Sequence, residues 1–433
     1  MKKPELLSPA GTLQSLRYAV AYGADAVYAG LPRYSLRVRE NEFDLKALKS
    51  AVDHIRKHNR RLYIACNLAP HNSKVDTFLR DVDPMVELAP DALIMSDPGL
   101  INMAKKAWPH MPIHLSVQAN VVNYAAVDFW KEMGLSRIIL SRELSIEEIE
   151  VIRNRCTDME LEVFIHGALC IAYSGRCLLS GYMNHRDANQ GSCTNSCRWD
   201  YKLHEAKQTE TGAVVPIHRR DIDNKMYLLE DPSRPGALMP TYEDEHGTYI
   251  MNSKDLRAVQ HVERFTNMGL DSLKIEGRTK SYFYTARTTQ VYRQAIDAAA
   301  QKKPFQPVWY DNLANLANRG YTEGFYRRHP PQEHQNYLQG SSQNGQQFVG
   351  EVIDQNQSLG QLTILVKNHF EVGDNLELIT PQGNYPFVLQ HMETLKGEKK
   401  DIAPGSGITV VIAAPFAGGA EYGLLIKSLG KAA

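Results

Sequence analysis

Short apolar runs alternate with amphipathic stretches over the first 300 residues of the chain. Each run ends in polar or small residues, as a buried parallel strand does at its edge of the sheet. The runs predict eight strands, at 5–9, 26–30, 62–67, 92–96, 113–118, 137–141, 161–166 and 272–276. Helical spacing of apolar residues appears between them, at 13–22, 44–58, 124–133 and 145–155. This alternation favours an α/β fold with a TIM-like (β/α)8 barrel, with a doubly wound sheet as the alternative.

The connection between the seventh and eighth predicted strands is about 100 residues long. Connections in α/β folds usually span roughly two to six residues, so we interpret this segment as an insertion into the barrel. Its cysteine-bearing part covers about 167–247. Residues 248–252 predict a short extra strand, and Ser253 is typical of a helix N-cap, so we expect a helix to begin there. With a further helix at 281–300, the predicted barrel domain covers 1–328.

A second domain follows a polar stretch at 329–347, whose Pro, Gln, Ser and Gly residues are typical of a linker. Beyond it, β-type runs are separated by Gly, Asp and Asn turns. These runs lie at 362–366, 375–379, 408–412 and 422–426. The pattern predicts a small C-terminal β-barrel domain at 348–433.

The composition, 43% hydrophobic and 23% charged, is that of a soluble globular protein and excludes disordered and fibrous classes. Forty-nine basic and forty-nine acidic residues cancel, so no overall field attracts nucleic acid or membranes. No apolar run approaches the roughly 18 residues of a membrane span, and no apolar region follows the N-terminal lysines. We therefore expect a cytoplasmic protein with no membrane attachment, in which cysteines stay reduced or bind metal.

Four of the six cysteines fall within 28 residues, with the spacing C-x6-C-x15-C-x3-C. They are Cys170, Cys177, Cys193 and Cys197. Glycines within the segment let the backbone fold closely around a compact object, and four thiolates can saturate a [4Fe-4S] cluster. Structural zinc is the competing metal, although its cysteines usually come in short pairs, and buried thiols are the plain alternative. Cys66 and Cys156 lie in an apolar strand and a helix end, and neither is proposed as a ligand.

Residues 162–180, EVFIHGALCIAYSGRCLLS, match the pattern E-x-F-x2-G-[SA]-[LIVM]-C-x4-G-x-C-x-[LIVM]-S. This is the signature of the collagenase-like peptidase family, peptidase family U32. The segments ELLSPAG, GADAVYAGL and KIEGRTKSYFY also resemble that family, and the β-rich tail is similar to its C-terminal domain. The resemblance covers most of the chain and implies a barrel carrying a smaller β domain.

Several branches of the family are associated with oxygen-independent hydroxylation that uses a [4Fe-4S] cluster. The segment GSCTNSCRWDY resembles the branch that acts on tRNA. The resemblance implies tRNA as partner, 5-hydroxyuridine at the wobble position as product and prephenate as hydroxyl source. It implies Cys170, Cys177 and Cys193 as ligands. Some branches take the fourth ligand from elsewhere, and this chain has no cysteine after Cys197.

Hydroxylating C5 of uracil is a two-electron oxidation, so a cofactor must perform it while the protein holds base and donor. TIM barrels place such sites at the C-terminal ends of their strands. Candidate catalytic residues there are His166, Glu143 and Glu276. Candidate substrate-binding residues are Arg37, Arg39, Asn67, Gln118, Asn120, Arg142 and Arg278, the arginines as receptors for the two carboxylates of prephenate.

Each candidate has a structural alternative. Glu143 and Glu276 could be ion pairs that close the barrel mouth, and His166 could be a hydrogen-bonded structural residue. Arg37 and Arg39 could belong to a solvated loop. The aromatic residues at 282–284 could stack on a base or pack in the core.

Two other functions stay open beside the RNA hydroxylase. A peptidase needs an activated nucleophile or a metal-bound water, and the sequence has no H-E-x-x-H and no G-x-S-x-G in a strand-to-helix context. The third possibility is a non-catalytic scaffold, carrying zinc or a cluster, that presents the C-terminal domain to RNA.

Overall fold

The structure is a computed structural model of the chain. It describes residues 2–36, 42–170, 172–180, 185–198, 206–208, 214–216, 227–230, 238–244, 247–249, 254–327, 345–416 and 418–429. Among these residues no helix has both the length and the apolar character that crossing a membrane would require.

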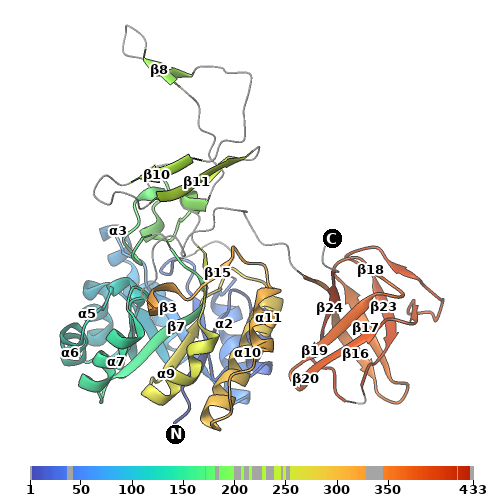
Figure 1. Cartoon of the computed structure of the whole chain (residues 1–433). Coiled ribbons are helices and arrows are strands. Elements are labelled where there is room, and N and C mark those ends of the chain that lie inside the picture. The colour runs from blue at the N-terminus through green and yellow to red at the C-terminus, as the bar shows by residue number, and fades with distance from the viewer. Residues whose placement is uncertain are drawn as a thin grey trace.

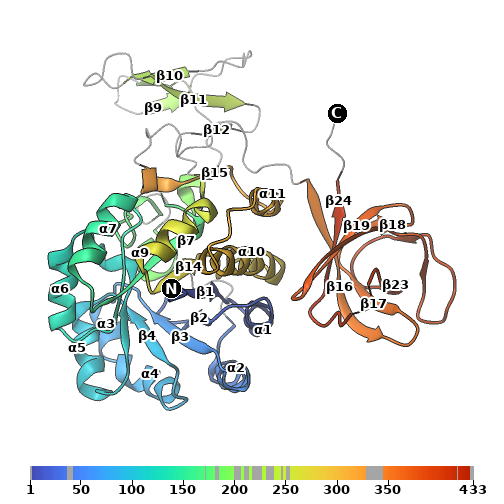
Figure 2. The same ribbon diagram turned by 60° about the horizontal axis from the view of Figure 1, so that its bottom comes forward.

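Eight parallel strands close into a barrel, in the order β14-β1-β2-β3-β4-β5-β6-β7, and β14 also pairs with β7. Helices surround the strands (Figure 2). The strands are β1 (Glu5–Pro9), β2 (Ala26–Gly30), β3 (Arg61–Cys66), β4 (Ala92–Met95), β5 (Ile113–Leu115), β6 (Arg137–Ile139), β7 (Glu160–Ala168) and β14 (Ser272–Ile275). All eight coincide with strands expected from the sequence, so the predicted fold class is confirmed.

The helices follow the amphipathic stretches of the sequence. They are α1 (Leu13–Ala21), α2 (Leu45–Lys57), α3 (Asn72–Val75), α4 (Phe78–Val86), α5 (Pro98–Ala107), α6 (Tyr124–Glu132), α7 (Ile146–Arg155), α9 (Val262–Met268), α10 (Tyr282–Ala300) and α11 (Val308–Ala314). In α2, residues three and four apart are buried against the strands while Asp44 caps the N-terminus. In α7, Ser145 and Glu148 form a capping box, which fixes where the helix begins.

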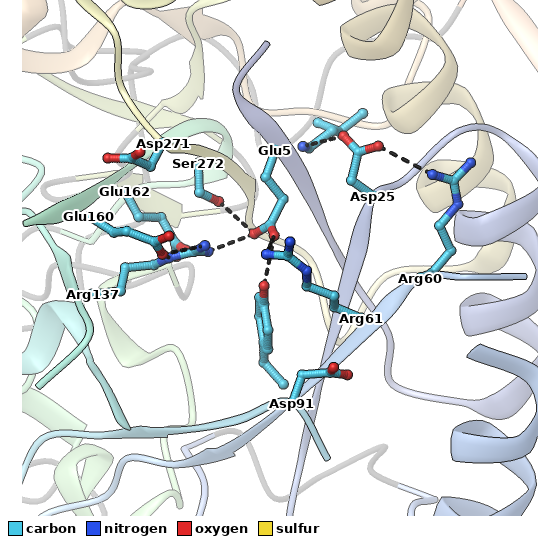
Figure 3. Close-up of polar contacts among 12 residues, drawn as sticks. Glu5, Asp25, Arg60, Arg61, Asp91, Arg137, Glu160, Glu162, Asp271 and Ser272 are labelled. Carbon is cyan, nitrogen blue, oxygen red and sulfur yellow. Dashed lines mark hydrogen bonds and ion pairs between the residues drawn. The ribbon is translucent and has the colours of Figure 1, made fainter. Parts of the chain in front are cut away.

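The barrel interior contains charged side chains near the ends at which the strands begin, and Figure 3 shows their polar contacts. The Arg137 guanidinium is 2.6 Å from a carboxylate oxygen of Glu5 and 3.2 Å from one of Glu162. The other oxygen of Glu162 is 2.9 Å from Nζ of Lys274. Burial alone would raise the pKa of Glu162, but Lys274 and Arg137 outweigh it and hold that pKa below its usual value. The ion pairs among these side chains offset the free energy that the charges lose when they are removed from water.

The insertion begins where β7 ends, and it returns to the barrel through β13 (Asp255–Arg257), which runs antiparallel to β7. The predicted helix start at 253–256 is therefore wrong. Asp255 and Leu256 are buried because they extend the sheet beside the end of β7. After the short 3-10 helix η4 (Val259–His261), α9 begins at Val262. Ser253 itself lies outside the described residues.

Short strands are also described within the insertion. They are β8 (Ala206–Gln208), β9 (Val214–Pro216), β10 (Tyr227–Glu230), β11 (Leu238–Asp244) and β12 (Gly247–Tyr249). β12 overlaps the start of the strand expected at 248–252, and residues 250–252 lie outside the described part. A further strand, β15 (Tyr321–Thr322), pairs in parallel with β13.

The C-terminal domain is an antiparallel sheet of order β20-β19-β24-β16-β17-β23-β21, with β18 and β22 as a separate pair. Its strands are β16 (Gln346–Asn356), β17 (Gln361–Val366), β18 (Phe370–Glu371), β19 (Asn375–Thr380), β20 (Gly383–Val388), β21 (Met392–Glu393), β22 (Ile402–Ala403), β23 (Thr409–Ala413) and β24 (Leu424–Ser428). β16 begins at Gln346, two residues before the start of the domain expected from the sequence.

The C-terminal sheet packs on α1 and α10 of the barrel (Figures 1 and 2). The Tyr22 hydroxyl is 3.0 Å from the carbonyl oxygen of Ile379, and Gln290 donates to the carbonyl of Thr380 at 3.0 Å. Phe283 stacks on Phe348 with ring centroids 5.1 Å apart. Of the aromatic residues at 282–284, Tyr282 and Phe283 both contact Phe348 and therefore pack at the junction of the two domains.

We predict that Gly167→Ala strongly destabilises the protein. Gly167 has a φ of +108°, and an added Cβ would lie 2.4 Å from the backbone oxygen of Glu276. Left-handed backbone costs a non-glycine residue about 1–2 kcal/mol, and overpacking adds about 1–3 kcal/mol. Urea unfolding should show a lower midpoint. Gly269→Ala is the control, because Gly269 has a φ of +77° but nothing within 4 Å of the added atom. Equal losses in both variants would contradict the steric explanation.

Candidate functional site

A cavity opens at the C-terminal ends of the barrel strands, and the first part of the insertion forms one of its walls. Side chains from β2, β3, β7 and β14 contribute to the lining, together with the loop after β7. All four clustered cysteines line it, namely Cys170, Cys177, Cys193 and Cys197. The structure thus brings the predicted thiols to a single cavity at the mouth of the barrel.

The loop that carries the cysteines is shaped by residues with left-handed backbone. Gly175 has a φ of +70°, and a Cβ there would lie 3.0 Å from Cγ of Gln118, so glycine lets the loop approach the rim closely. Asn195, with a φ of 59°, donates its backbone N–H to Sγ of Cys193 at 3.4 Å. Asn189 donates to the carbonyl of Cys177 at 3.1 Å. These two hydrogen bonds lie within the loop and fix its shape.

The six cysteines all lie in the described part of the chain, and none forms a disulfide. Burial raises the pKa of Cys66 to about 12, and burial also raises that of Cys156, so both thiols stay protonated. Neither lines the cavity. Within the described residues, no three histidine, cysteine, aspartate or glutamate side chains are arranged to hold one metal ion. The four clustered cysteines line one cavity in this structure, but their sulfur atoms do not converge as the ligands of one metal ion would.

Five other predicted site residues line the same cavity, namely Asn67, Gln118, Arg142, Glu276 and Arg278. Asn67 donates to Oε1 of Gln118 at 2.9 Å and to the hydroxyl of Ser116 at 3.1 Å. The side-chain oxygen Oδ1 of Asn67 accepts from the backbone N–H of Leu36 at 3.2 Å. The two amides are therefore held in fixed orientations at the ends of β3 and β5.

Two arginines line the cavity, Arg142 after β6 and Arg278 after β14. The Arg142 guanidinium lies 3.9 Å from the centre of the Phe164 ring, donates to the carbonyl of Ala168 at 2.7 Å and is 3.5 Å from Glu276. Arg278 donates to the carbonyl of Leu36 at 2.6 Å. A Cβ on Gly30 would lie 1.8 Å from its guanidinium, so glycine at the end of β2 makes room for this side chain.

Lys274 also lines the cavity, and sequence reasoning missed it. It is 3% exposed, and its ammonium lies 4.4 Å from the centre of the Tyr28 ring. Burial lowers the pKa of Lys274, partly offset by Glu162. The sequence did carry a signal for this residue, namely a lysine within the predicted strand run SLKI. A charge inside a barrel strand needs a partner, so Lys274 could have been expected at a polar site. Lys274 connects the charged barrel interior to the cavity.

Asn120, Glu143 and His166, the other predicted site residues in the described part of the chain, are not among the cavity lining. Asn120 bridges the barrel and the cysteine loop, donating to the carbonyl of Ser174 at 2.9 Å. Glu143 accepts a hydrogen bond from the Ser141 hydroxyl near the end of β6. Arg37 and Arg39 lie outside the described residues.

His166 is buried within β7 and does not line the cavity. Its ring is surrounded by three tyrosines, Tyr284, Tyr292 and Tyr321, with centroids 5.4–5.8 Å away. The Tyr292 hydroxyl is 3.3 Å from its Nδ1. Burial lowers the pKa of His166 to about 3, and the charges of Arg257 and Lys280 contribute. The side chain is therefore neutral at physiological pH.

A closed parallel barrel with a thiol-lined cavity at the C-terminal ends of its strands defines a TIM-barrel protein with a candidate active site in the usual place. The model of peptidase family U32 matches residues 11–336, and the model of the peptidase family U32 C-terminal domain matches 344–427. The chain belongs to peptidase family U32.

The chain is also similar to individual proteins. It is 57% identical to tRNA hydroxylation protein P of Escherichia coli (strain K12), with 99% of this chain and 97% of that protein covered. It is 53% identical to the protein of the same name from Haemophilus influenzae, over 99% of this chain and 96% of that one. A solved U32 peptidase, Mk0906, aligns at 14% identity and a TM-score of 0.39, over 64% of this chain and 95% of that chain.

We predict that His166→Phe reduces the loss of stability in acid. The pKa of His166 falls from 6.5 to about 3 on folding. Between these two pH values the unfolded chain binds a proton at this histidine and the folded chain does not. Stability is then lost as the pH falls below 6.5, by about 1.4 kcal/mol at pH 5.5. Urea unfolding at pH 7.5 and 5.5 should show a smaller difference for the variant. The exposed His110 supplies the control, His110→Phe, and an equal pH effect in wild type and His166→Phe would refute the prediction.

Proposed function

We propose that the protein hydroxylates tRNA, forming 5-hydroxyuridine at the wobble position with prephenate as hydroxyl source and a [4Fe-4S] cluster as cofactor. One observation carries the proposal: four clustered thiols line one cavity at the mouth of a barrel. Support for the substrate comes from 57% identity over nearly the whole chain to a protein named tRNA hydroxylation protein P.

The residues at the cavity fit an iron-sulfur cluster in their chemistry. Cys170, Cys177, Cys193 and Cys197 supply one thiolate for each iron of a [4Fe-4S] cluster. The backbone N–H of Asn195, 3.4 Å from Sγ of Cys193, provides the kind of hydrogen bond that stabilises a thiolate ligand. When bound, the cluster supplies the redox chemistry that side chains lack.

The part of the chain's own residues is to bind and orient the base and the donor. Gln118 accepts from Asn67 through Oε1, which leaves its amide nitrogen to donate to a carbonyl oxygen of uracil. Tyr28 and Phe164 form apolar walls against which a flat ring can lie. Both rings already hold cations, Lys274 and Arg142, so a base packed there would lie beside fixed positive charge.

The positive charge in the cavity suits prephenate, the proposed hydroxyl source, because prephenate has two carboxylates. Among the described residues, Arg142, Arg278 and Lys274 all line the cavity, against a single carboxylate, that of Glu276. Each guanidinium carries five N–H donors in a fixed fork, so an arginine bound to one carbonyl can still receive a carboxylate. We expect Arg142 and Arg278 to bind the carboxylates of prephenate and Lys274 to donate from the floor of the cavity.

Peptide hydrolysis, which the family's title suggests, is not our proposal. A thiol or hydroxyl nucleophile is usually activated by an adjacent base, most often histidine. In the described part of the chain, the cavity lining includes neither histidine nor aspartate.

Cys177→Ser should abolish cluster binding, because serine cannot replace the thiolate. Protein purified without oxygen should lose most of its iron, its acid-labile sulfide and its broad visible absorbance. Cys156→Ser is the matched control, since that buried thiol lies outside the cavity and should leave iron content unchanged. Full iron and sulfide in Cys177→Ser, or zinc in place of iron in the wild type, would overturn the cluster.

The RNA substrate is tested in cells that lack the gene and any redundant pathway. Mass spectrometry of tRNA nucleosides should show loss of 5-hydroxyuridine, with recovery on expression of the wild type and none on expression of Cys177→Ser. Cys156→Ser should restore the modification. Unchanged 5-hydroxyuridine in the deletion strain would rule out this function.

A further inference from the structure

A second pocket lies beside the cysteine-lined cavity, on the other side of the end of β7. It is lined by Lys254, Arg257, Gln260, Tyr310, Tyr321 and Glu323 together with Thr322. Within the antiparallel pairing of β13 with β7, Asp255 is opposite Ala168 and Arg257 is opposite His166. Because Ala168 is the last residue of β7, the pocket lies at the same rim of the barrel as the cavity. Figure 1 labels β15, which pairs with β13 and carries two of the lining residues.

Arg257 is held in place by aromatic rings. Its guanidinium carbon lies 4.2 Å from the centre of the Tyr310 ring and 4.7 Å from that of Tyr321. One of its nitrogens donates to the carbonyl of Tyr310 at 3.4 Å. Among the residues that the structure describes, no carboxylate lies within 4 Å of this guanidinium, and Asp311 is near enough only for a longer-range attraction. Stacking fixes the fork while leaving most of its N–H groups available.

The neighbouring carboxylates already have partners of their own. Asp255 accepts from Arg319 at 3.0 Å. Glu323, the one acidic residue among the described residues that line the pocket, is 2.8 Å from Nε2 of His261 and 2.7 Å from Nε of Arg327. Within the part of the chain that the structure describes, the positive charge of Arg257 and Lys254 is therefore not cancelled inside the pocket.

Gln260 adds an unsatisfied polar group to the same pocket. Both its Nε2 and its Oε1 are shielded from solvent, and neither has a hydrogen-bond partner among the described residues. Such groups cost free energy unless a ligand satisfies them. A stacked guanidinium, an ammonium and an amide together form a donor set suited to an oxyanion such as phosphate.

We propose that this pocket binds a phosphate group of the RNA backbone while a base occupies the cysteine-lined cavity. The inference rests on the proposed function, because it takes RNA as the substrate. A cavity that receives one base leaves the neighbouring nucleotides on the rim, and the pocket lies on that rim beside β7. Lys254 and Arg257 neutralise the phosphate, and Gln260 donates to it.

The test measures binding of unmodified tRNA to the full-length protein, purified without oxygen, over a range of KCl concentrations. Neutralising one phosphate contributes about 0.7–0.9 to the slope of log K against log salt. Arg257→Gln and Lys254→Gln should each weaken binding several-fold at low salt and reduce the slope by roughly that amount. Arg257→Lys should keep the slope of the wild type, since it keeps the charge, while still weakening binding.

Arg264→Gln is the matched control. Arg264 lies on α9 nearby, and its guanidinium already pairs with Glu147 and Glu150, at 2.9 and 3.2 Å, so its removal should not change the slope. Lys254→Gln keeps the test valid if Arg257→Gln fails to fold. The aromatic stacking on Tyr310 and Tyr321 involves Arg257 and not Lys254, so replacing Lys254 should leave that packing intact.

The outcomes separate this site from the function on which it rests. If wild type binds tRNA and both charge-removing variants keep its slope, the phosphate site is wrong and the proposed function stands. If inorganic phosphate at constant ionic strength binds the wild type but not Arg257→Gln, with equal tRNA slopes, the pocket takes free phosphate and the RNA contact is overturned. If wild type does not bind tRNA, both proposals fail.

Discussion

The pairing of β14 with both β1 and β7 is the constraint on which the rest of the structure depends. It closes the sheet, so the C-terminal ends of all eight strands meet at one rim, where residues far apart in sequence can share a site. It also places Lys274 of β14 beside Glu162 of β7, which in turn contacts Arg137 of β6. These charges compensate one another inside the barrel, and the chain of contacts ends at the floor of the cavity.

The barrel could be predicted from the sequence because its strands are buried on both faces and are therefore continuous apolar runs. Asn67, Gln118, Arg142, Glu276 and Arg278 could also be predicted, since polar residues at parallel strand ends must gather at the rim. His166 follows the same rule by position, yet it faces Tyr284, Tyr292 and Tyr321, which come from segments more than a hundred residues later. β13 was expected as a helix because its pairing with the end of β7 is a long-range contact without a local signal. Lys274 was missed because its partner Glu162 is also distant in sequence.

The rim combines two kinds of environment on either side of β7. On one side the thiols, amides and cations of the cavity surround a space with apolar walls, which suits a planar base and an anionic donor. On the other side Arg257 is fixed between tyrosines, and no carboxylate of the described residues pairs with it. The C-terminal sheet packs on α1 and α10, held by Tyr22, Gln290 and the Phe283–Phe348 stack. We propose that one end of the barrel performs the chemistry and positions the RNA.

The central claim is that the four clustered cysteines bind one iron-sulfur cluster at the barrel mouth. The most direct measurement is a crystal structure of protein purified without oxygen, with anomalous diffraction recorded on both sides of the iron absorption edge. The account predicts a single compact iron peak in the cavity, bonded by the sulfur atoms of Cys170, Cys177, Cys193 and Cys197. A zinc edge at that position, or iron bound elsewhere while these sulfur atoms stay apart, would contradict it.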